Sequence, residues 1–184
     1  MLRRLRRDER GTTMVEMALV FPLLLVLTFA ILEFGNLSYQ WLIAEKATEM
    51  GARFAVTSNI VATGIPECGV ATTATAGTPC RQIAGSVGWQ RTCTSGSSGC
   101  DATAFNAIVQ QMRTIYPRIA PGNVTVQYFG TGLGFVGRGS PVPNVTVSLN
   151  GLTFDFVVLN GLFGFGPITM PDFRATLTGE DLSS

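Results

Sequence analysis

The first 34 residues constrain this chain more than any other feature. Five arginines lie between Arg3 and Arg10, and an apolar segment follows that ends near Phe34. The run from Met17 to Leu32 holds 16 residues without a charge. With its apolar flanks it reaches the length that a helix rising about 1.5 Å per residue needs to cross a bilayer. We therefore predict a transmembrane helix over residues 12–34.

A cleavable secretory signal is the rival interpretation, because such signals also begin with basic residues followed by an apolar core. Their cleavage site needs small residues, in an A-x-A-like pattern, directly after the core. Leu32, Glu33, Phe34 and Gly35 stand there instead. The sequence favours a retained anchor.

The charge distribution predicts the orientation of this anchor. Arginines that precede a span tend to stay in the cytoplasm, so everything after Phe34 is expected on the far side of the inner membrane. Four cysteines lie in that part of the chain, namely Cys68, Cys80, Cys93 and Cys100. An even number in an oxidising compartment indicates two disulfides, and three pairings are open. A zinc site is disfavoured because CxxC spacing and histidine are both absent.

The helical pattern continues beyond the span, so we predict one helix from Thr12 to Val56. Its second part, residues 35–57, is expected to form an amphipathic stem with many small residues on one stripe. Such a stripe lets another backbone approach closely, either from the same chain or from a neighbouring subunit. Pro22 lies within the apolar part and removes one backbone hydrogen bond, which predicts a kink or a loosened turn there that can also matter in assembly.

Residues 58–184 are predicted to form one α+β domain. Asn59–Asp101 is rich in glycine, threonine, serine and alanine and is expected to be a loop region stapled by disulfides. Apolar residues at helical spacing predict a second, short helix over Ala102–Tyr116. An antiparallel β-sheet of about four strands should follow. The candidate strands are Asn123–Phe129, Asn144–Leu149, Thr153–Leu159 and Phe173–Leu177. The segment Phe163–Phe165 is expected in the core rather than in a contact surface.

The sequence offers little for catalysis. Without histidine, His-based triads, His metal sites and imidazole acid–base chemistry are excluded. The glycines of Gly130–Gly137 lack the spacing and the GK[ST] ending of a phosphate loop. No basic patch for nucleic acid is visible. We expect no enzyme, no cofactor and no metal.

Glu16 is the one charged residue between Gly11 and Leu32. A charge within an apolar helix costs about 2 to 3 kcal/mol near the bilayer centre and less near the interface, so it needs a partner or a purpose. The surrounding segment GTTMVEMALVFPLLL, residues 11–25, resembles the N-terminal signature of TadE-like minor pseudopilins of the tight-adherence (Tad) pilus, a branch of the type IV pilus and type II secretion superfamily. In that family a glycine precedes the cut, a glutamate occupies the fifth mature position and an early proline follows. Gly11, Glu16 and Pro22 match this spacing.

The resemblance implies that a prepilin peptidase cuts between Gly11 and Thr12 and removes residues 1–11 as a basic leader. Thr12 and Thr13 are more polar than the bulky residue usual at this point in major pilins. The freed Thr12 amine could then pair with the Glu16 carboxylate of a neighbouring subunit and fix their axial offset. Alternatively, Glu16 reaches the headgroups, where it also favours the positive end of the helix dipole.

The function implied is that of a structural subunit assembled into or at the base of a Tad-type pilus for surface attachment. The implied partners are the membrane, other pilin subunits contacted through the N-terminal helix, the prepilin peptidase and the inner-membrane assembly platform. The soluble domain would lie in the periplasm, or outside the cell after assembly. An uncleaved, membrane-anchored assembly factor of the same system is an alternative. A membrane-tethered enzyme or ligand-binding domain is another, and it would need a concave site with convergent polar groups.

Overall fold

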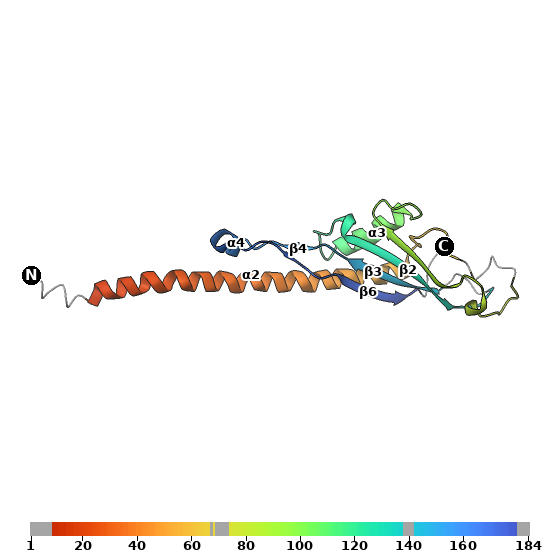
Figure 1. Cartoon of the computed structure of the whole chain (residues 1–184), viewed down its shortest axis with the longest axis horizontal. Coiled ribbons are helices and arrows are strands. Elements are labelled where there is room, and N and C mark those ends of the chain that lie inside the picture. The colour runs from red at the N-terminus through yellow and green to blue at the C-terminus, as the bar shows by residue number, and fades with distance from the viewer. Residues whose placement is uncertain (1–8, 67, 69–73, 138–141, 180–184) are drawn as a thin grey trace, which may run out of the picture. The chain divides into compact units, whose positions relative to one another are not determined.

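A computed structural model of the chain describes residues 9–66, 68, 74–137 and 142–179 (Figure 1). The predicted basic leader therefore lies outside the described residues up to position 8. Three α-helices are described, in chain order α2 (Glu9–Thr57), α3 (Ala102–Arg113) and α4 (Val158–Phe163). The strands are β1 (Val87–Thr94), β2 (Val124–Leu133), β3 (Val142–Leu149), β4 (Thr153–Phe154), β5 (Ile168–Thr169) and β6 (Phe173–Thr178). This composition confirms the predicted α+β class.

The chain forms two compact units. One unit comprises Met1–Gln40 and Thr153–Ile168, and the other comprises Trp41–Leu152 and Thr169–Ser184. The boundary at Gln40 falls within α2, so the helix contributes its first part to one unit and its last part to the other. The two units are called the helix unit and the sheet unit below.

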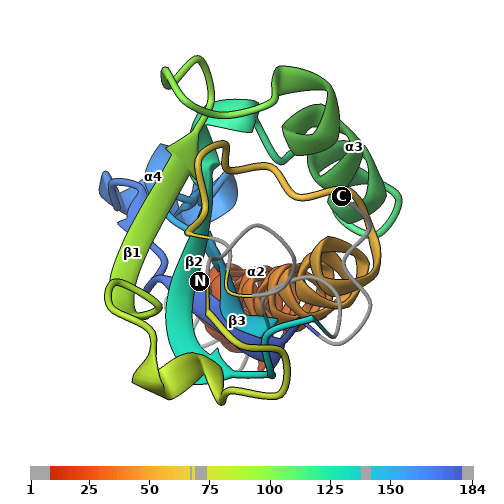
Figure 2. The same ribbon diagram turned by 90° about the vertical axis from the view of Figure 1, so that its right-hand side faces the viewer.

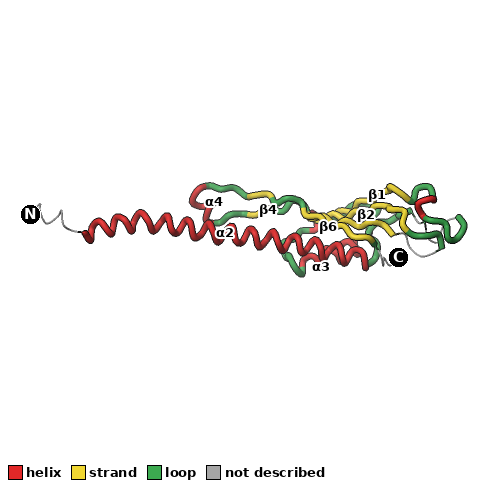
Figure 3. The backbone as a smooth tube through the Cα atoms, turned by 90° about the horizontal axis from the view of Figure 1, so that it is seen from below, coloured by secondary structure: helices red, strands yellow, loops and turns green. Residues whose placement is uncertain are grey.

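The sheet unit is built on four antiparallel strands in the order β1-β2-β3-β6. Figure 3 labels β1, β2 and β6 of this sheet. In β2 the side chains alternate, and Val124, Val126 and Tyr128 are fully buried on one face. Val126 pairs with Cys93 of β1 and with Val147 of β3, so the core runs across the middle of the sheet. The predicted antiparallel sheet of about four strands is confirmed.

One member of the sheet differs from the prediction. Strand β1 comes from the segment Asn59–Asp101, which was expected to be loop. The sequence did not indicate a strand there because this edge strand buries only Cys93 and carries no apolar alternation. The candidate strand Thr153–Leu159 was wrong for most of its length. Only Thr153–Phe154 is extended, in β4, which pairs with β5, whereas Val158 begins helix α4.

Helix α3 and the part of α2 that belongs to the sheet unit lie on the same side of the sheet (Figure 2). Asp101 caps α3, accepting hydrogen bonds from the backbone N–H groups of Thr103 and Ala104 at 2.7 and 3.1 Å. The apolar face of α3 is buried, and so is the small-residue stripe of α2, whose members are Ala44, Ala47, Thr48, Gly51, Ala52 and Ala55. A Cβ on Gly51 would lie 2.7 Å from Met112 Cγ of α3 and 3.4 Å from Val147 Cγ1 of β3. The stem therefore packs within the chain, which decides between the two partners that the sequence left open.

Both expected disulfides are present. Cys68 pairs with Cys80, and Cys93 pairs with Cys100. Each bridge joins two consecutive cysteines of the sequence, which are 12 residues apart in the first bridge and 7 in the second. The first bridge packs with Val136 in a small buried cluster of its own. The second ties the end of β1 to Cys100, the residue before Asp101.

Candidate functional site: the apolar N-terminal helix

The residues that the sequence singled out for processing and assembly all lie on the first half of α2. Gly11 and Thr12 fall in its first turns, and Glu16 and Pro22 follow on the same helix. All four are exposed within the described structure. A Cβ on Gly11 would meet nothing within 4 Å, so the chain does not crowd the predicted cleavage point.

This half of the helix exposes apolar side chains around its circumference. Met14 is 78% exposed, Leu19 73% and Leu23 74%, and the most apolar window of the helix has no buried residue. In the part of the chain that the structure describes, α2 is the one helix long and apolar enough to cross a membrane. Such a surface is compatible with lipid or with neighbouring apolar helices, whereas a stable monomer in water would bury it.

Glu16 lies within this apolar surface. Among the residues that the structure describes, it takes part in no ion pair. The side chain is exposed, so none of the described residues compensates the loss of hydration that lipid or a helix bundle would impose. Within the described residues, this carboxylate is therefore open to a group from outside them.

The helix continues through Pro22. Because proline has no N–H group, the carbonyl of Ala18 lacks its usual donor four residues later. Pro22 also lines an apolar groove of about 490 Å³ within the helix unit, between α2 and α4. The other lining residues are Leu25, Val26, Phe29, Val157, Val158, Gly161 and Leu162.

A second carboxylate, Glu33, has a role that the sequence analysis did not anticipate. Its Oε1 accepts hydrogen bonds from the backbone N–H groups of Val157 and Val158, both at 2.6 Å, and its Oε2 accepts one from Leu159 at 3.1 Å. These are orphan donors at the start of α4, whose own N-cap residue, Val157, offers no side-chain acceptor. The start of α4 has no Ser, Thr, Asp or Asn at its N-cap position. This was the one available signal that the acceptor for its first N–H groups must come from another part of the chain.

Aromatic rings extend this contact. The ring centroids of Phe34 and Phe156 are 5.6 Å apart, and Phe156 also meets Phe154 at 5.1 Å and Phe165 at 6.5 Å. The expectation that Phe163–Phe165 is core is wrong, because Phe163 is 58% exposed and Phe165 55%. This segment presents its rings to the surroundings of the helix unit.

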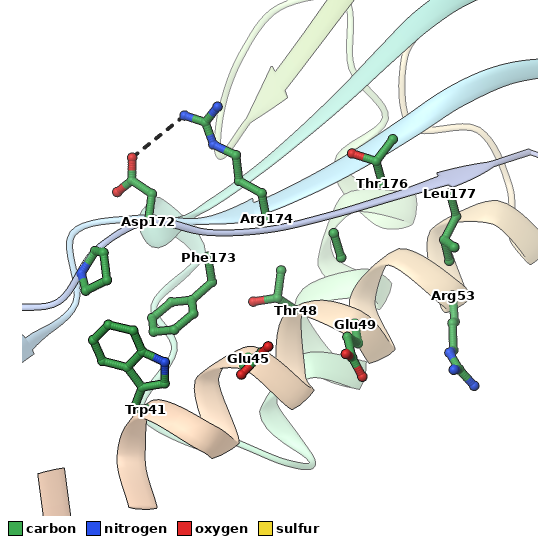
Figure 4. A pocket seen from close by; sticks show the side chains of 12 residues that line it. Trp41, Glu45, Thr48, Glu49, Arg53, Asp172, Phe173, Arg174, Thr176 and Leu177 are labelled. Carbon is green, nitrogen blue, oxygen red and sulfur yellow. Dashed lines mark ion pairs between the residues drawn. The ribbon is translucent and has the colours of Figure 1, made fainter. Parts of the chain in front are cut away.

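The sheet unit has a groove of its own, about 520 Å³ in volume, between the last turns of α2 and strand β6 (Figure 4). Asp172 and Arg174 form an ion pair at 3.8 Å on its rim, and Trp41 packs edge-on against Phe173 at 5.4 Å. A hydrogen bond from Lys46, together with the charges of Lys46 and Arg53, lowers the pKa of the Glu49 carboxyl.

The polar groups of this groove already have partners or face water. The Thr48 hydroxyl donates to the carbonyl of Ala44 at 2.8 Å, deep under the groove. In the described part of the chain, the two buried side-chain oxygens without a partner, on Ser58 and Asn150, lie outside it. No group of three or more metal-ligating side chains is found among the described residues. The arrangement does not converge on a reacting centre.

Comparison with known proteins gives one match. The family model described as TadE-like protein matches residues 11–53, which lie entirely on α2. The predicted resemblance is thereby confirmed for the N-terminal helix, and the matched range contains Gly11, Glu16 and Pro22. No match is found among curated proteins or among solved structures.

Proposed function

We propose that this chain, whose N-terminal helix is TadE-like, is a structural subunit of Tad pilus biogenesis. It is anchored by α2 in the inner membrane, processed by a prepilin peptidase and assembled with other pilin subunits through that helix. The observation that carries the proposal is the match over residues 11–53, on a helix whose first part exposes apolar surface and the Glu16 carboxylate. The sheet unit lies in the periplasm, and it leaves the cell where the subunit enters a pilus.

The proposed cut between Gly11 and Thr12 lies close to the start of α2, which begins at Glu9. The first turn of a helix lacks part of its hydrogen-bond ladder and frays readily. Opening this turn presents the peptide bond to a peptidase without disturbing the buried part of the helix, which begins beyond residue 39.

Cleavage gives Glu16 its partner. The new Thr12 amine is a positive charge at the end of an apolar helix, and Glu16 is a negative charge one turn further along. Within one helix the two are about 6 Å apart along the axis, so their pairing between subunits shifts one helix against the next by about this distance. Pairing offsets the desolvation of both groups in a helix bundle.

The N-terminus of the mature protein tests processing. The full chain is produced with an active prepilin peptidase, and the purified protein is examined by N-terminal sequencing and intact mass. A start at Thr12 is expected. A chain that retains residues 1–11 beside an active peptidase contradicts processing and favours the uncleaved assembly factor.

Two glycine variants provide a controlled comparison. Gly11 and Gly35 both lie on α2, and a Cβ on either would meet nothing within 4 Å. Gly11→Val should block cleavage, whereas Gly35→Val should be processed like the original chain. Equal processing of both variants would remove Gly11 from the recognition of the cut.

Glu16→Gln tests assembly, with Glu45→Gln as its control because Glu45 is an exposed glutamate on the sheet-unit part of the same helix. Both variants should enter the membrane fraction normally. Glu16→Gln should lose co-purification with pilin subunits, and Glu45→Gln should retain it. Full co-purification of Glu16→Gln would refute the pairing role.

A further inference from the structure

The connection from β4 to β5 is a hairpin, defined here as Thr153–Ile168, that belongs to the helix unit. Its one charged residue, Asp155, lies at the base, directly after β4. The sequence from Phe156 to Pro171 contains no charged residue. At the tip, Val157 is 79% exposed and Leu162 60%. Together with the rings of Phe163 and Phe165, these side chains form an apolar surface that needs a nonaqueous environment.

Helix α4 lies beside the middle of the predicted span. The groove between them is lined on the α2 side by residues from Pro22 to Phe29, well inside the apolar run that ends at Leu32. Eleven residues separate Pro22 from Glu33, which is about 16 Å along a helix and about half of a 30 Å hydrocarbon core. With Glu33 at the membrane surface, the hairpin occupies the depth of one leaflet.

The backbone of α4 is prepared for such an environment. Lipid offers no hydrogen-bond partners, so polar backbone groups at membrane depth must be satisfied within the protein. Glu33 accepts the first three donors of the hairpin helix. At its other end, the N–H group of Gly164 donates to the carbonyl of Asn160 at 2.8 Å, with Gly164 in the left-handed conformation at φ 70°.

From these observations we infer that the hairpin Thr153–Ile168 is a second membrane-contacting element, inserted beside α2 into the leaflet opposite the basic leader. Lipid acyl chains cover its exposed apolar side chains, and Glu33 fixes it to α2 at the surface. The inference rests on the membrane anchor of the proposed function. It adds that residues from the far end of the sequence take part in membrane contact.

This placement leaves Glu16 accessible to partners. Successive residues of a helix turn by about 100°, so Glu16 lies about 120° around α2 from the face that carries Pro22 and Glu33. It also precedes Pro22 by six positions. The hairpin therefore covers one face of the helix and leaves the face of Glu16 open to a neighbouring subunit.

Spin labels can measure the depth of the hairpin in the full chain reconstituted in phosphatidylcholine–phosphatidylglycerol vesicles. The four native cysteines are held in disulfides, so a single added cysteine carries the label. Leu162→Cys tests the hairpin, Leu24→Cys serves as the reference for the span, and Val87→Cys serves as the aqueous reference. The three side chains are similarly exposed, at 60, 51 and 52%.

Collision with oxygen and with a polar nickel chelate distinguishes the outcomes. At Leu162 we expect oxygen access and a severalfold reduction of nickel access relative to Val87, as at Leu24. If nickel reaches Leu162 as readily as Val87 while Leu24 remains protected by lipid, the hairpin inference is overturned and the membrane anchor stands. Nickel access at Leu24 as well overturns the membrane anchor. Exclusion of both reagents from Leu162 indicates a second copy of the chain as the cover and also overturns the lipid assignment.

Glu33→Ala tests the attachment, with Glu45→Ala as the control. Loss of the three acceptor contacts should make the Leu162 label more mobile and raise its nickel access severalfold, whereas Glu45→Ala should change neither. An unchanged label in Glu33→Ala would show that Glu33 does not hold the hairpin.

Discussion

Gly51 allows the packing of the stem to be measured. Its backbone passes so close to α3 that a Cβ would lie 2.7 Å from Met112 Cγ and 2.8 Å from Met112 Sδ. Met112 is itself fully buried, so its thioether cannot move out into solvent. Gly51→Ala therefore sets the better helix propensity of alanine against a steric conflict in the core.

The two effects can be compared. Alanine gains about 1 kcal/mol over glycine within a helix, whereas an added methyl group in a close-packed core costs about 1 to 3 kcal/mol. We expect Gly51→Ala to lower the free energy of unfolding by up to about 2 kcal/mol. Met112→Ala alone should cost about 2 to 5 kcal/mol. In that background Gly51→Ala should stabilise by about 1 kcal/mol, because the space is then open.

Urea unfolding of the full chain in a nonionic detergent provides the assay. Trp41 fluorescence, recorded in a Trp89→Phe background, reports on the sheet unit because Trp41 packs against Phe173 of β6. Gly35→Ala is the control, since a Cβ there would meet nothing within 4 Å and should carry no packing cost. If Gly51→Ala stabilises the chain equally with and without Met112, the close packing of α2 on α3 is refuted.

Two further predictions concern the sheet unit. Tyr128→Phe should cost about 1 to 3 kcal/mol in the same unfolding assay, because the Tyr128 hydroxyl accepts the Val61 N–H at 3.1 Å within the core. Burial raises the pKa of Tyr128, so the folded chain keeps a proton that the unfolded chain loses above about pH 10. Stability should therefore fall above that pH, and the advantage over Tyr128→Phe should shrink; a constant difference would contradict the linkage. Separately, reduction of the disulfides should increase proteolysis within residues 59–101 while the chain stays in the membrane fraction, since each bridge contributes about 2 to 3 kcal/mol for loops of this length. Unaltered cleavage would show that the bridges do not hold this region.

Helices α2 and α3 could be predicted because each repeats one physical signal many times. α2 carries apolar and small residues from Thr12 to Val56 at helical spacing, and the observed helix exceeds this range by only a few residues. α3 has four buried apolar residues on one face and an aspartate at its N-cap. Strands β2 and β3 alternate for the same reason, since one face of each lies on the core.

The errors fall where the local pattern is weak. β1 is an edge strand whose side chains mostly face solvent, so its polar sequence is typical of a loop. It is held by backbone pairing with β2, and side-chain periodicity does not report on such pairing. The alternation of Thr153–Leu159 continues a strand pattern past Phe156, but the chain turns there because Glu33 offers acceptors to the next three N–H groups. That acceptor is more than 120 positions away in the sequence. The residues around Val157 show that α4 lacks a cap of its own, but they do not identify Glu33 as the acceptor.

The two carboxylates at the ends of the apolar helix segment have different proposed roles, one in assembly and one in holding the hairpin. Both Glu16 and Glu33 are acids beside lipid-length apolar sequence, and each needs compensation for lost hydration. Glu33 receives it from three backbone donors of its own chain. Glu16 makes no ion pair in the described part of the chain, and under the proposed function its compensation comes from headgroups or from another subunit. Removing Glu33 should therefore disturb the hairpin of the isolated subunit. Removing Glu16 should leave the isolated subunit unchanged and affect only its assembly. This contrast distinguishes a glutamate that stabilises its own chain from one that binds another subunit.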